Sequence, residues 1–380
     1  MTTHTGAVLD SCRTGAEIAQ QPDVWREVAA LVAGQRDALD RFVTDALTDP
    51  RTEIVLTGAG TSSYIGELVA SEVARHTGRT ATAVPTTDVV ASPATALPAD
   101  RPVLLVSFAR SGDSPESVAA VELADQVIPG TRHLVITCNA AGALGQRCAD
   151  RADAYVLTLP EASNDAGFAM TSSFTGMALA TLLAFGSGTD VAALATAAEA
   201  VRAVAEEAAA AVLALRPRRL VHLGSGALKG LAHESALKCL ELTAGRVLAL
   251  ADTPMAFRHG PKSALDGTTV AVVYLSNDPY TRQYDVDLAR ELSTTLGAER
   301  VVVVDATGDA DVPATTWSVP GVAGLPDAEW ALPAVLFAQV LALAASLAEG
   351  LTPDNPFPGG EVNRVVQGVV IHPYTGPKGQ

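Results

Sequence analysis

Lysine is scarce in this chain of 380 residues, which has only four lysines although lysine and arginine together number 26. Three of the four, Lys229, Lys238 and Lys262, fall in the short stretch 229–262. In a chain that otherwise uses arginine, a lysine among the apolar residues of a predicted helix is not expected to be an ordinary solvent-exposed side chain. The scarcity of lysine therefore indicates that this stretch carries chemistry.

Positive charge is also scarce, because the formal net charge is −16 at pH 7. A protein that neutralises the phosphates of a nucleic acid or an anionic membrane needs a basic face. The charge therefore excludes nucleic acid and membrane surfaces as expected partners. It does not exclude a small phosphorylated ligand, since backbone N–H groups at a helix N-terminus bind phosphate without net positive charge.

Cysteines and targeting signals are few. The four cysteines include no Cys-x-x-Cys pair, which is typical of a reduced cytosolic protein. The first residues, MTTHTGAVLD, lack the basic and apolar regions of a signal peptide. The longest apolar stretch, 332–348, contains Gln339 and is short for a bilayer, so we expect a buried helix there. These features predict a soluble, cytoplasmic protein.

The two halves of the sequence resemble each other. A strand pattern followed by a glycine-rich turn occurs at 53–63 and again at 219–230, and three further elements repeat at nearly the same offset. These elements are the apolar strands at 102–114 and 269–281, the strands at 133–139 and 300–306, and the apolar helices at 173–185 and 331–345. Four matched elements indicate an internal duplication.

Each half alternates strands with helices, which predicts an α/β fold of two tandem three-layer α/β/α units with parallel sheets. The composition, 48% hydrophobic and 18% charged, suits a globular chain with two cores. Helices are also expected at 20–47 and 191–215, and a final strand at 365–373. The predicted division is an N-terminal helical arm (1–47), a first domain (48–190), a linking helix (191–216), a second domain (217–350) and a C-terminal tail (351–380).

The first glycine-rich turn, GAGTSS at 58–63, is not a dinucleotide fingerprint. Ser63 replaces the third glycine of GxGxxG, and no acidic residue ends the next strand (80–85) to bind a ribose hydroxyl. The Walker pattern is absent too, because no lysine follows the turn. We therefore do not expect NAD as a cofactor.

Hydroxyl side chains are concentrated in two turns of the first half. Thr61 and Ser62 follow the first strand, and a second turn, SFARSGDSPES at 107–117, follows the next one. The carboxyl ends of adjacent parallel strands are where α/β sheets bind ligands, and hydroxyls beside helix starts can hold phosphate. A single serine of this kind is more often a helix cap, but two such turns together favour a phosphate cradle. In the second half SGDS has become SNDP, which predicts that this copy has lost phosphate binding.

The stretch 233–262 carries most of the chemistry visible in the sequence. Glu234, Lys238 and Glu241 stand at i, i+4 and i+7, so a helix places them on one face, and His259 follows in a His-Gly-Pro turn. Leu237 stands where the second histidine of HExxH would be, so no zinc site and no other metal is expected. The triplet alone is compatible with a salt-bridged helix face or with an acid–base site.

These motifs resemble the double SIS (sugar isomerase) family over nearly the whole chain. The first half carries GAGTS and RSGDSPES, and the second carries ESALKCLE and HGP, which are similar to the isomerase half of glucosamine-6-phosphate synthase. A bacterial group in this family, the galactosamine-6-phosphate deaminase/isomerases, also labelled tagatose-6-phosphate ketose/aldose isomerases, is resembled more closely. The segments concerned are AMTSSFT (169–175), HESALKCLELTAG (233–245), FRHGPKS (257–263) and GEVNRVVQGVVIHP (360–373).

The resemblance implies a role for each residue at a matching position. The residues implied to hold the sugar phosphate are Gly60, Thr61, Ser62, Ser111 and Ser114. In the second half, Glu241 is implied to move a proton between C1 and C2, with Lys238 beside it and Glu234 one turn earlier. His259 is implied to open the sugar ring and to be donated across the interface of a homodimer.

The sequence departs from the synthase at three positions. Gln367 stands where the synthase has the lysine that forms an imine with the ketose, and Ala109 and Arg110 replace a serine and a glutamine of the phosphate loop. Arg110 can be interpreted either as a phosphate contact or as a solvent-exposed side chain. Further candidates for lining or closing the site are His233, Gln367, Asn363 and Arg364.

Isomerisation of a sugar phosphate needs a base that moves a proton between adjacent carbons and a group that stabilises the enediol oxygens. Glu241 and Lys238 fit these roles, and no cofactor is required. A 2-amino aldose would give a ketimine, which water hydrolyses to a ketose and ammonia. Because the imine-forming lysine is missing, we predict that ammonia is released. The resemblance implies that the substrate is galactosamine-6-phosphate and the product tagatose-6-phosphate. The alternatives are a plain ketose/aldose phosphate isomerase and a non-catalytic phosphosugar sensor.

Overall fold

A computed structural model describes residues 8–366 and 368–376. Backbone contacts divide the chain into two compact units with one five-stranded sheet each. The β1–β5 unit consists of residues 27–164, 173–189 and the tail from 360, and the β6–β10 unit consists of residues up to 26, 165–172 and 190–359. Each unit thus includes segments that are distant in the sequence. The five-part division predicted from the sequence remains a prediction.

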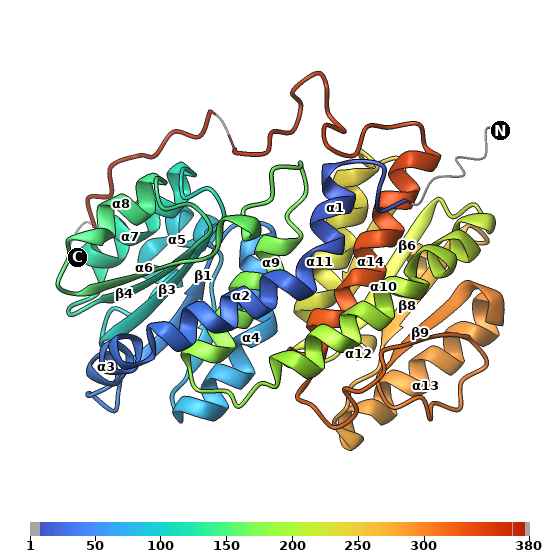
Figure 1. The fold of residues 1–380 in the computed structure, drawn as a ribbon, viewed down its shortest axis with the longest axis horizontal. Helices are drawn as coiled ribbons and strands as arrows, with labels where there is room; N and C mark the ends of the chain where they lie inside the picture. Colours follow the sequence, from blue (N-terminus) through green and yellow to red (C-terminus); the bar gives the residue numbers. More distant parts are fainter. Residues whose placement is uncertain (1–7, 367, 377–380) are drawn as a thin grey trace. The chain divides into compact units, whose positions relative to one another are not determined.

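The sheet of the β1–β5 unit is parallel throughout, with strand order β2-β1-β3-β4-β5 (Figure 1). Its strands are β1 (Glu53–Thr57), β2 (Ala81–Ala83), β3 (Val103–Ala109), β4 (Arg132–Thr137) and β5 (Ala154–Thr158). Every residue of β3 is buried, as expected for an apolar strand with helices on both faces.

Helices cover both faces of this sheet. On one face α5 (Thr86–Ala91), α7 (Pro115–Val127) and α8 (Ala143–Ala149) share a hydrophobic cluster with Val55 and Leu105. On the other face α4 (Thr61–Thr77) packs against the neighbouring position Leu56. Further helices in this part of the chain are α2 (Gln21–Gly34), α3 (Arg36–Ala46), α6 (Pro93–Ala96), the 3-10 helix η1 (Glu161–Ser163) and α9 (Ser172–Ala184).

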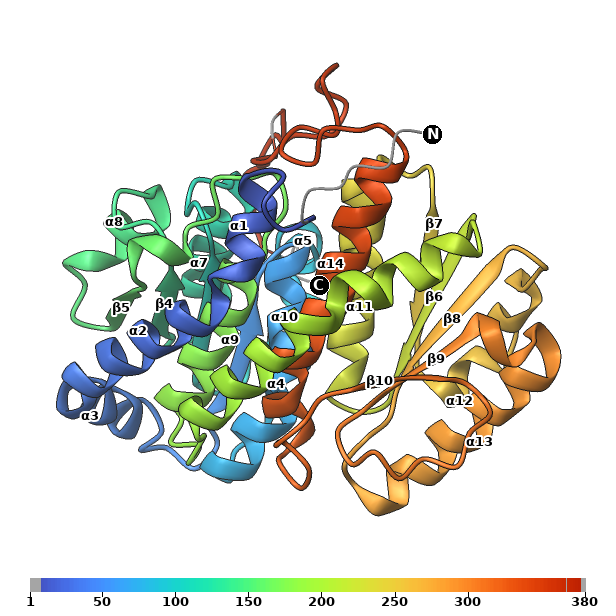
Figure 2. The same ribbon diagram turned by 45° about the vertical axis from the view of Figure 1, so that its right-hand side comes forward.

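The sheet of the β6–β10 unit is also parallel, with strand order β10-β9-β8-β6-β7 (Figure 2). Its strands are β6 (Arg219–Gly224), β7 (Leu248–Asp252), β8 (Thr269–Tyr274), β9 (Val301–Asp305) and β10 (Thr315–Ser318). Its helices are α1 (Arg13–Ala19), α10 (Val191–Ala214), α11 (Leu228–Leu242), α12 (Pro254–Phe257), α13 (Pro279–Leu296) and α14 (Asp327–Ala348), with the 3-10 helices η2 (Pro261–Ala264) and η3 (Ala298–Arg300). One face packs on α13, and α11 contacts β6, β7 and α14.

The predicted duplication is confirmed by the topology. The first sheet has the order β2-β1-β3-β4-β5. Read from the β7 end, the second sheet has the order β7-β6-β8-β9-β10, so corresponding strands occupy the same places. The turns agree as well, because Gly60 after β1 has φ +55° and Gly226 after β6 has φ +56°. Glycine adopts this left-handed region at no steric cost. The α/β fold of two parallel-sheet units is therefore established.

The apolar helix α14 has the length and composition to cross a membrane, but its most apolar 18-residue window is 83% buried in the protein. It packs on α10 and α11 within the β6–β10 unit. Gln339, in the middle of its apolar stretch, is buried and accepts a hydrogen bond of 2.7 Å from the side chain of Gln21. These are the features of a core helix, as predicted from the sequence.

The predicted final strand at 365–373 is wrong. The described residues of that range form no strand, and they run as an irregular segment. Ile371 and Tyr374 instead pack on the hydrophobic cluster of the β1–β5 unit. A run of apolar residues forms a strand only where a neighbouring strand can pair with it. Here Ile371 is half-buried, and Val366 and Val370 are 49% and 70% exposed. Gln367 lies outside the described residues.

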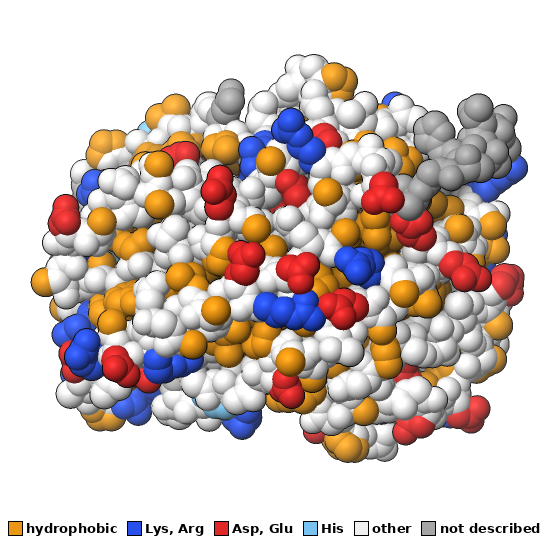
Figure 3. All heavy atoms as spheres, in the orientation of Figure 1, with side chains coloured by type: hydrophobic (Ala, Val, Ile, Leu, Met, Phe, Trp, Pro, Cys, Tyr) orange, Lys and Arg blue, Asp and Glu red, His pale blue; other side chains and the backbone are white. Residues whose placement is uncertain are grey.

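On the face drawn in Figure 3, acidic and basic side chains are intermixed. Among the exposed ion pairs of the protein, Arg26 lies 2.8 Å from Asp23 and 2.7 Å from Glu199. Exposed pairs of this kind contribute little to stability, because water and salt screen them, so they describe a solvated surface.

Candidate active site

Helix α11 carries the Glu-Lys-Glu triplet. It begins after the turn at Gly226, and it ends where Ala244 and Gly245 adopt positive φ. Such left-handed residues commonly terminate helices. The predicted helix is therefore present, and it fixes which side chains share a face.

The three charged side chains of the triplet meet on one face of α11. Lys238 is fully buried; its Nζ lies 3.6 Å from Oε1 of Glu234 and donates a hydrogen bond to Oε2 of Glu241. Glu234 is fully buried too, whereas the Glu241 side chain is 24% exposed. Burying an ammonium between two carboxylates has a large desolvation cost, which an exposed ion pair avoids. The geometry therefore favours an acid–base site over a solvated salt-bridged face.

A series of buried polar groups joins α11 to the sheet beneath it. The Ser235 hydroxyl lies 2.7 Å from the Tyr274 hydroxyl, which lies 3.4 Å from Nδ1 of His222. Burial lowers the pKa of His222 to about 3 and raises the pKa of Tyr274 well above its ordinary value. Both side chains are therefore neutral near pH 7 and act through hydrogen bonds. None of the three residues was predicted as part of the site, because nothing in their local sequence marks them.

The His-Gly-Pro turn lies between α12 and η2. His259 is exposed, and in residues 8–366 and 368–376 its side chain has no hydrogen bond or ion pair. Its neighbours are held by one carboxylate of α13: Arg258 Nε lies 2.9 Å from Oε2 of Glu291, and Lys262 Nζ donates to Oε1. The chain thus fixes the turn on both sides of His259, but no bond joins His259 to the α11 triplet.

The two hydroxyl-rich turns, 58–63 and 109–114, follow β1 and β3, which are adjacent strands. We call these two turns the first cradle. Thr61 and Ser62 are buried at the start of α4. Ser114 precedes Pro115 at the start of α7, and its hydroxyl donates to Glu116 at 2.5 Å. As predicted, both turns lie at one edge of the sheet and each opens a helix.

The second turn of the first cradle is braced by the segment after β4. The side-chain amide of Asn139 donates to the carbonyl oxygen of Ser111 at 2.8 Å. The Asp113 carboxylate accepts from the N–H of Ala143 at 3.0 Å, at the start of α8, and the Asp113 N–H donates to the Ser111 hydroxyl at 3.3 Å. Asp113 therefore shapes the turn rather than facing a ligand.

Arg110 is buried, with 6% of its surface exposed. Its Nη2 donates to the carbonyl oxygen of Arg364 at 2.8 Å, and both residues belong to the β1–β5 unit. The interpretation of Arg110 as a solvent-exposed side chain is therefore wrong. The guanidinium ties the C-terminal tail to the turn that contains Ser111 and Ser114.

Three buried hydroxyls near the first cradle have no hydrogen-bond partner within the described part of the chain. They are Thr57 at the end of β1, Ser107 beside it in β3, and Thr86 at the start of α5. An unsatisfied buried hydroxyl costs about 1–3 kcal/mol, which a bound polar ligand or water would recover. The available sequence signal is weak, since it consists of hydroxyl residues at the ends of apolar segments.

Other predicted site residues are less informative. His233 is half-buried on α11, and Gln367 lies outside the described residues. Among the described residues, no group of three or more histidine, cysteine, aspartate or glutamate side chains is arranged to hold a metal ion.

Comparison with known proteins places the chain in a family. Residues 46–186 match the SIS domain. The D-galactosamine-6-phosphate deaminase AgaS of Escherichia coli is 45% identical over 370 residues, which cover 95% of this chain and 96% of that protein. A Streptomyces coelicolor protein that carries the same name provisionally is 53% identical over 98% of this chain and 99% of its own length. The chain belongs to the SIS-domain family of these AgaS proteins.

Solved SIS structures agree with this assignment. The crystal structure of tagatose-6-phosphate ketose/aldose isomerase from Escherichia coli has a TM-score of 0.89 and 42% identity, covering 97% of this chain and 99% of that one. The SIS match at 46–186 includes the first cradle but ends before α11. The second SIS copy is evident from the repeated sheet order instead.

Proposed function

We propose that this chain is a sugar-phosphate enzyme that converts galactosamine-6-phosphate to tagatose-6-phosphate and ammonia. The observation that carries the proposal is the buried triplet on α11, in which Lys238 lies between Glu234 and the partly exposed Glu241. The AgaS relatives are named D-galactosamine-6-phosphate deaminase, which fits a site of this chemistry. A sensor that only binds phosphosugar has no need of a buried acid–base pair.

Glu241 acts as the base in this proposal. Its carboxylate removes the proton from C2 of the open-chain amino aldose and returns it to C1, which one carboxylate can do if it reaches both carbons. Lys238, which contacts Glu241, stabilises the negative charge that develops on the O1 oxygen. Glu234 is buried beside Lys238 and balances the charge of the ammonium.

Deamination follows from the product of the proton transfer. Loss of the C2 proton gives an enolamine, and protonation at C1 gives a ketimine at C2. Water adds to the ketimine carbon, and the C–N bond breaks to leave the ketose phosphate and ammonia. The step needs no oxidant, reductant or organic cofactor.

The phosphate is bound by the first cradle in this proposal, through Gly60, Thr61, Ser62, Ser111 and Ser114. Two serine-bearing turns at adjacent strand ends support this assignment. Arg110 adds a buried positive charge to the same loop. His233 and Gln367 remain candidates for lining the site.

The ring-opening acid–base group of the proposal is His259. Its exposed position on a braced turn suits a group that acts in a second copy of the chain, so we propose a homodimer with the active site at the subunit interface. A histidine has an ordinary pKa near neutrality, which suits proton transfer to and from a ring oxygen. A cytoplasmic location is proposed with the same function.

A plain ketose/aldose isomerase is the second candidate, because the similar Escherichia coli structure bears that name. The same proton transfer would then act on a sugar with a hydroxyl at C2, and no ammonia would leave. One assay separates the candidates: the protein is incubated with galactosamine-6-phosphate, glucosamine-6-phosphate and tagatose-6-phosphate, and ammonia and sugar phosphates are measured. Ammonia from galactosamine-6-phosphate is the expected result. If neither amino sugar releases ammonia while tagatose-6-phosphate is isomerised, the deaminase proposal is wrong; tight binding without turnover would support a sensor.

A further inference from the structure

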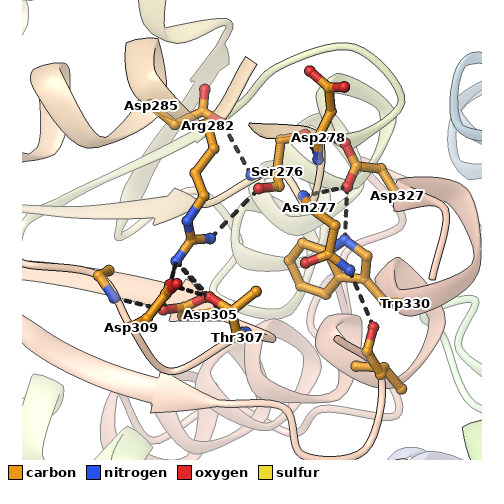
Figure 4. Close-up of polar contacts among 12 residues, drawn as sticks. Ser276, Asn277, Asp278, Arg282, Asp285, Asp305, Thr307, Asp309, Asp327 and Trp330 are labelled. Carbon is orange, nitrogen blue, oxygen red and sulfur yellow. Dashed lines mark hydrogen bonds and ion pairs between the residues drawn. The ribbon is translucent and has the colours of Figure 1, made fainter. Parts of the chain in front are cut away.

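The turns of the β6–β10 unit that correspond to the first cradle are 224–227 after β6 and 276–278 after β8, and we call them the second cradle. Two carboxylates of the chain itself, Asp285 and Asp327, accept hydrogen bonds from these turns. Figure 4 shows the bonds to the 276–278 turn. Asp285 accepts from the Ser225 hydroxyl at 2.5 Å and from the Ser276 N–H at 3.0 Å. Asp327 accepts from the Ser276 hydroxyl at 2.5 Å and from the Asn277 N–H at 2.8 Å.

The donors of the second cradle are of the kind that binds an oxyanion. Two hydroxyls and two backbone N–H groups donate to two carboxylates, the fully buried Asp285 and the half-buried Asp327, and donors of these kinds also bind phosphate. Ser276 and Asp285 are fully buried, and Asp327 is held further by the indole N–H of Trp330 at 2.8 Å. These four hydrogen-bond donors of the second cradle therefore have acceptors within the chain itself.

The first cradle has no equivalent of Asp285. Both helices that follow these turns begin with proline, Pro115 in α7 and Pro279 in α13. Asp285 stands six residues beyond Pro279, and the corresponding stretch of α7, residues 119–121, is alanine, alanine and valine, all buried. No carboxylate can reach the first cradle from that stretch of α7.

Asp285 also connects the second cradle to the proposed catalytic helix. Ser225 precedes the first residue of α11, Leu228, by three positions, and Asp285 lies on α13. The Ser225–Asp285 bond therefore joins α13 to the turn from which α11 starts. A shift of this turn would move Lys238 and Glu241 with the helix.

We infer that Asp285 and Asp327 replace the phosphate of the duplicated ancestor site in the second cradle, and that Asp285 is a positioning residue for α11. The positioning part rests on the proposed function, because it assumes that the α11 triplet performs the chemistry. The consequence is a division of labour: the chain binds one phosphate, in the first cradle, while the second cradle sets the geometry of the reacting groups.

The test compares Ser225→Ala, Asp285→Asn and the double variant with the full-length wild type. Because a small misplacement of catalytic groups is costly, we expect each single variant to lower kcat about tenfold with KM for galactosamine-6-phosphate within about twofold of wild type. The double variant should be no slower than the slower single variant, since both changes break the same bond. Asp309→Asn is the control, because Asp309 lies in the same group of side chains in Figure 4 but is 73% exposed; its kcat should equal that of wild type.

Unchanged kcat in both single variants would overturn the positioning role. A fold-decrease in kcat of the double variant equal to the product of the two single decreases would overturn it as well. A higher KM at unchanged kcat would overturn the inference as well, because the second cradle would then bind substrate. If Asp285→Asn fails to fold, Ser225→Ala tests the same bond alone.

A second readout needs no substrate. Amide hydrogen exchange at 225–234 should be at least about tenfold faster in Ser225→Ala and Asp285→Asn than in wild type, because the start of α11 is released. Unchanged exchange there would contradict the inference. A wild type that releases no ammonia would contradict only the proposed function, so the two failures are distinguishable.

Discussion

The two cradles have the same place in the topology and opposite ways of satisfying their donors. In the first cradle, Ser114 is the N-cap residue of α7 but makes no side-chain cap bond, and its hydroxyl donates to Glu116 instead. In the second cradle, α13 is capped by Asp278, whose carboxylate accepts from the N–H of Thr281 at 2.8 Å. One helix start thus lacks a carboxylate cap and the other has one built in.

This difference shows how a duplicated binding site can change its task without changing its fold. Carboxylates in the second cradle accept from the hydroxyls and N–H groups of both turns whether or not a ligand is bound. In the first cradle Glu116 accepts from Ser114, but the buried hydroxyls of Thr57, Ser107 and Thr86 nearby have no partner among the described residues, so a bound anion can add stabilisation there. The unit that keeps its own anion is also the unit that carries the buried triplet of α11. Rigid support for the reacting groups is a physical reason to prefer an internal carboxylate there.

The strongest test of this division removes the base. Glu241→Gln keeps the size of the side chain but cannot accept the C2 proton, so we expect kcat to fall by about 10²–10⁴-fold. Binding in the first cradle should be unaffected, so inorganic phosphate should inhibit substrate binding by the wild type and protect both proteins equally against heat. Ammonia release and thermal unfolding measure the two effects.

The matched control for this variant is Glu207→Gln, which changes an exposed carboxylate of α10. It should retain wild-type kcat. A Glu241→Gln protein that turns over at the wild-type rate would mean that the proton is moved by another group, and the division between the units would lose its catalytic half.

Removing one serine hydroxyl from each cradle and comparing the two variants gives the next largest effect. A hydrogen bond to a charged group contributes about 1.5–3 kcal/mol, so Ser111→Ala should raise KM by about tenfold or more. Ser276→Ala should leave KM within about twofold, because its hydroxyl already bonds Asp327. Initial rates over a range of galactosamine-6-phosphate concentrations measure both constants.

The rise in unfolding temperature caused by phosphate compares the same two variants without a measurement of turnover. Millimolar phosphate should raise the unfolding temperature of the wild type and Ser276→Ala, and much less that of Ser111→Ala. Equal KM changes in the two variants, or equal loss of phosphate stabilisation, would show that both cradles bind the anion.

The sequence allowed the fold and the triplet to be predicted because both rest on local patterns. Apolar strands such as VVVV at 301–304 indicate a parallel sheet, and the spacing of Glu234, Lys238 and Glu241 specifies a shared helix face. The substitution of SNDP for SGDS marks a difference between the turns after β3 and β8, and the loss of phosphate binding by the second copy remains a prediction.

The rest depended on contacts between distant residues. Asp285 and Asp327 meet the second cradle from two different helices, and nothing near them in the sequence marks a buried carboxylate. Arg110 was open to two interpretations because its burial depends on Arg364, which is 254 residues away. The apolar pattern at 365–373 predicted a strand for the same reason, since the pattern alone does not reveal whether a neighbouring strand pairs with it.

The turn of His259 offers a smaller test. Glu291→Gln weakens two partly exposed ion pairs, to Arg258 and Lys262, each worth about 1 kcal/mol or less. We expect kcat/KM to fall about three- to tenfold, because the turn samples more positions. Asp311→Asn is the control, since it removes an exposed partner of Arg290 on the same helix and should change nothing. Equal activity of both variants and wild type would show that the bracing of the turn is irrelevant to turnover.

The last prediction concerns activity least and stability most, because the buried carboxylate of the second cradle lowers the stability of the fold at neutral pH. Burial, with a further contribution from the Asp327 carboxylate, raises the pKa of Asp285 to about 6, although bonds from Ser225 and Ser276 and the charge of Arg282 oppose the rise. A carboxyl whose pKa is higher in the folded than in the unfolded chain stabilises the fold at low pH, and this contribution is lost as the pH rises through about 6. Asp285→Asn lacks this dependence, so the unfolding free energy of wild type relative to the variant should fall by about 2 kcal/mol between pH 4.5 and pH 7. Urea unfolding at both pH values measures it. Parallel curves would mean that the carboxylate is not held against a desolvation cost, and that the second cradle maintains its internal anion without loss of stability.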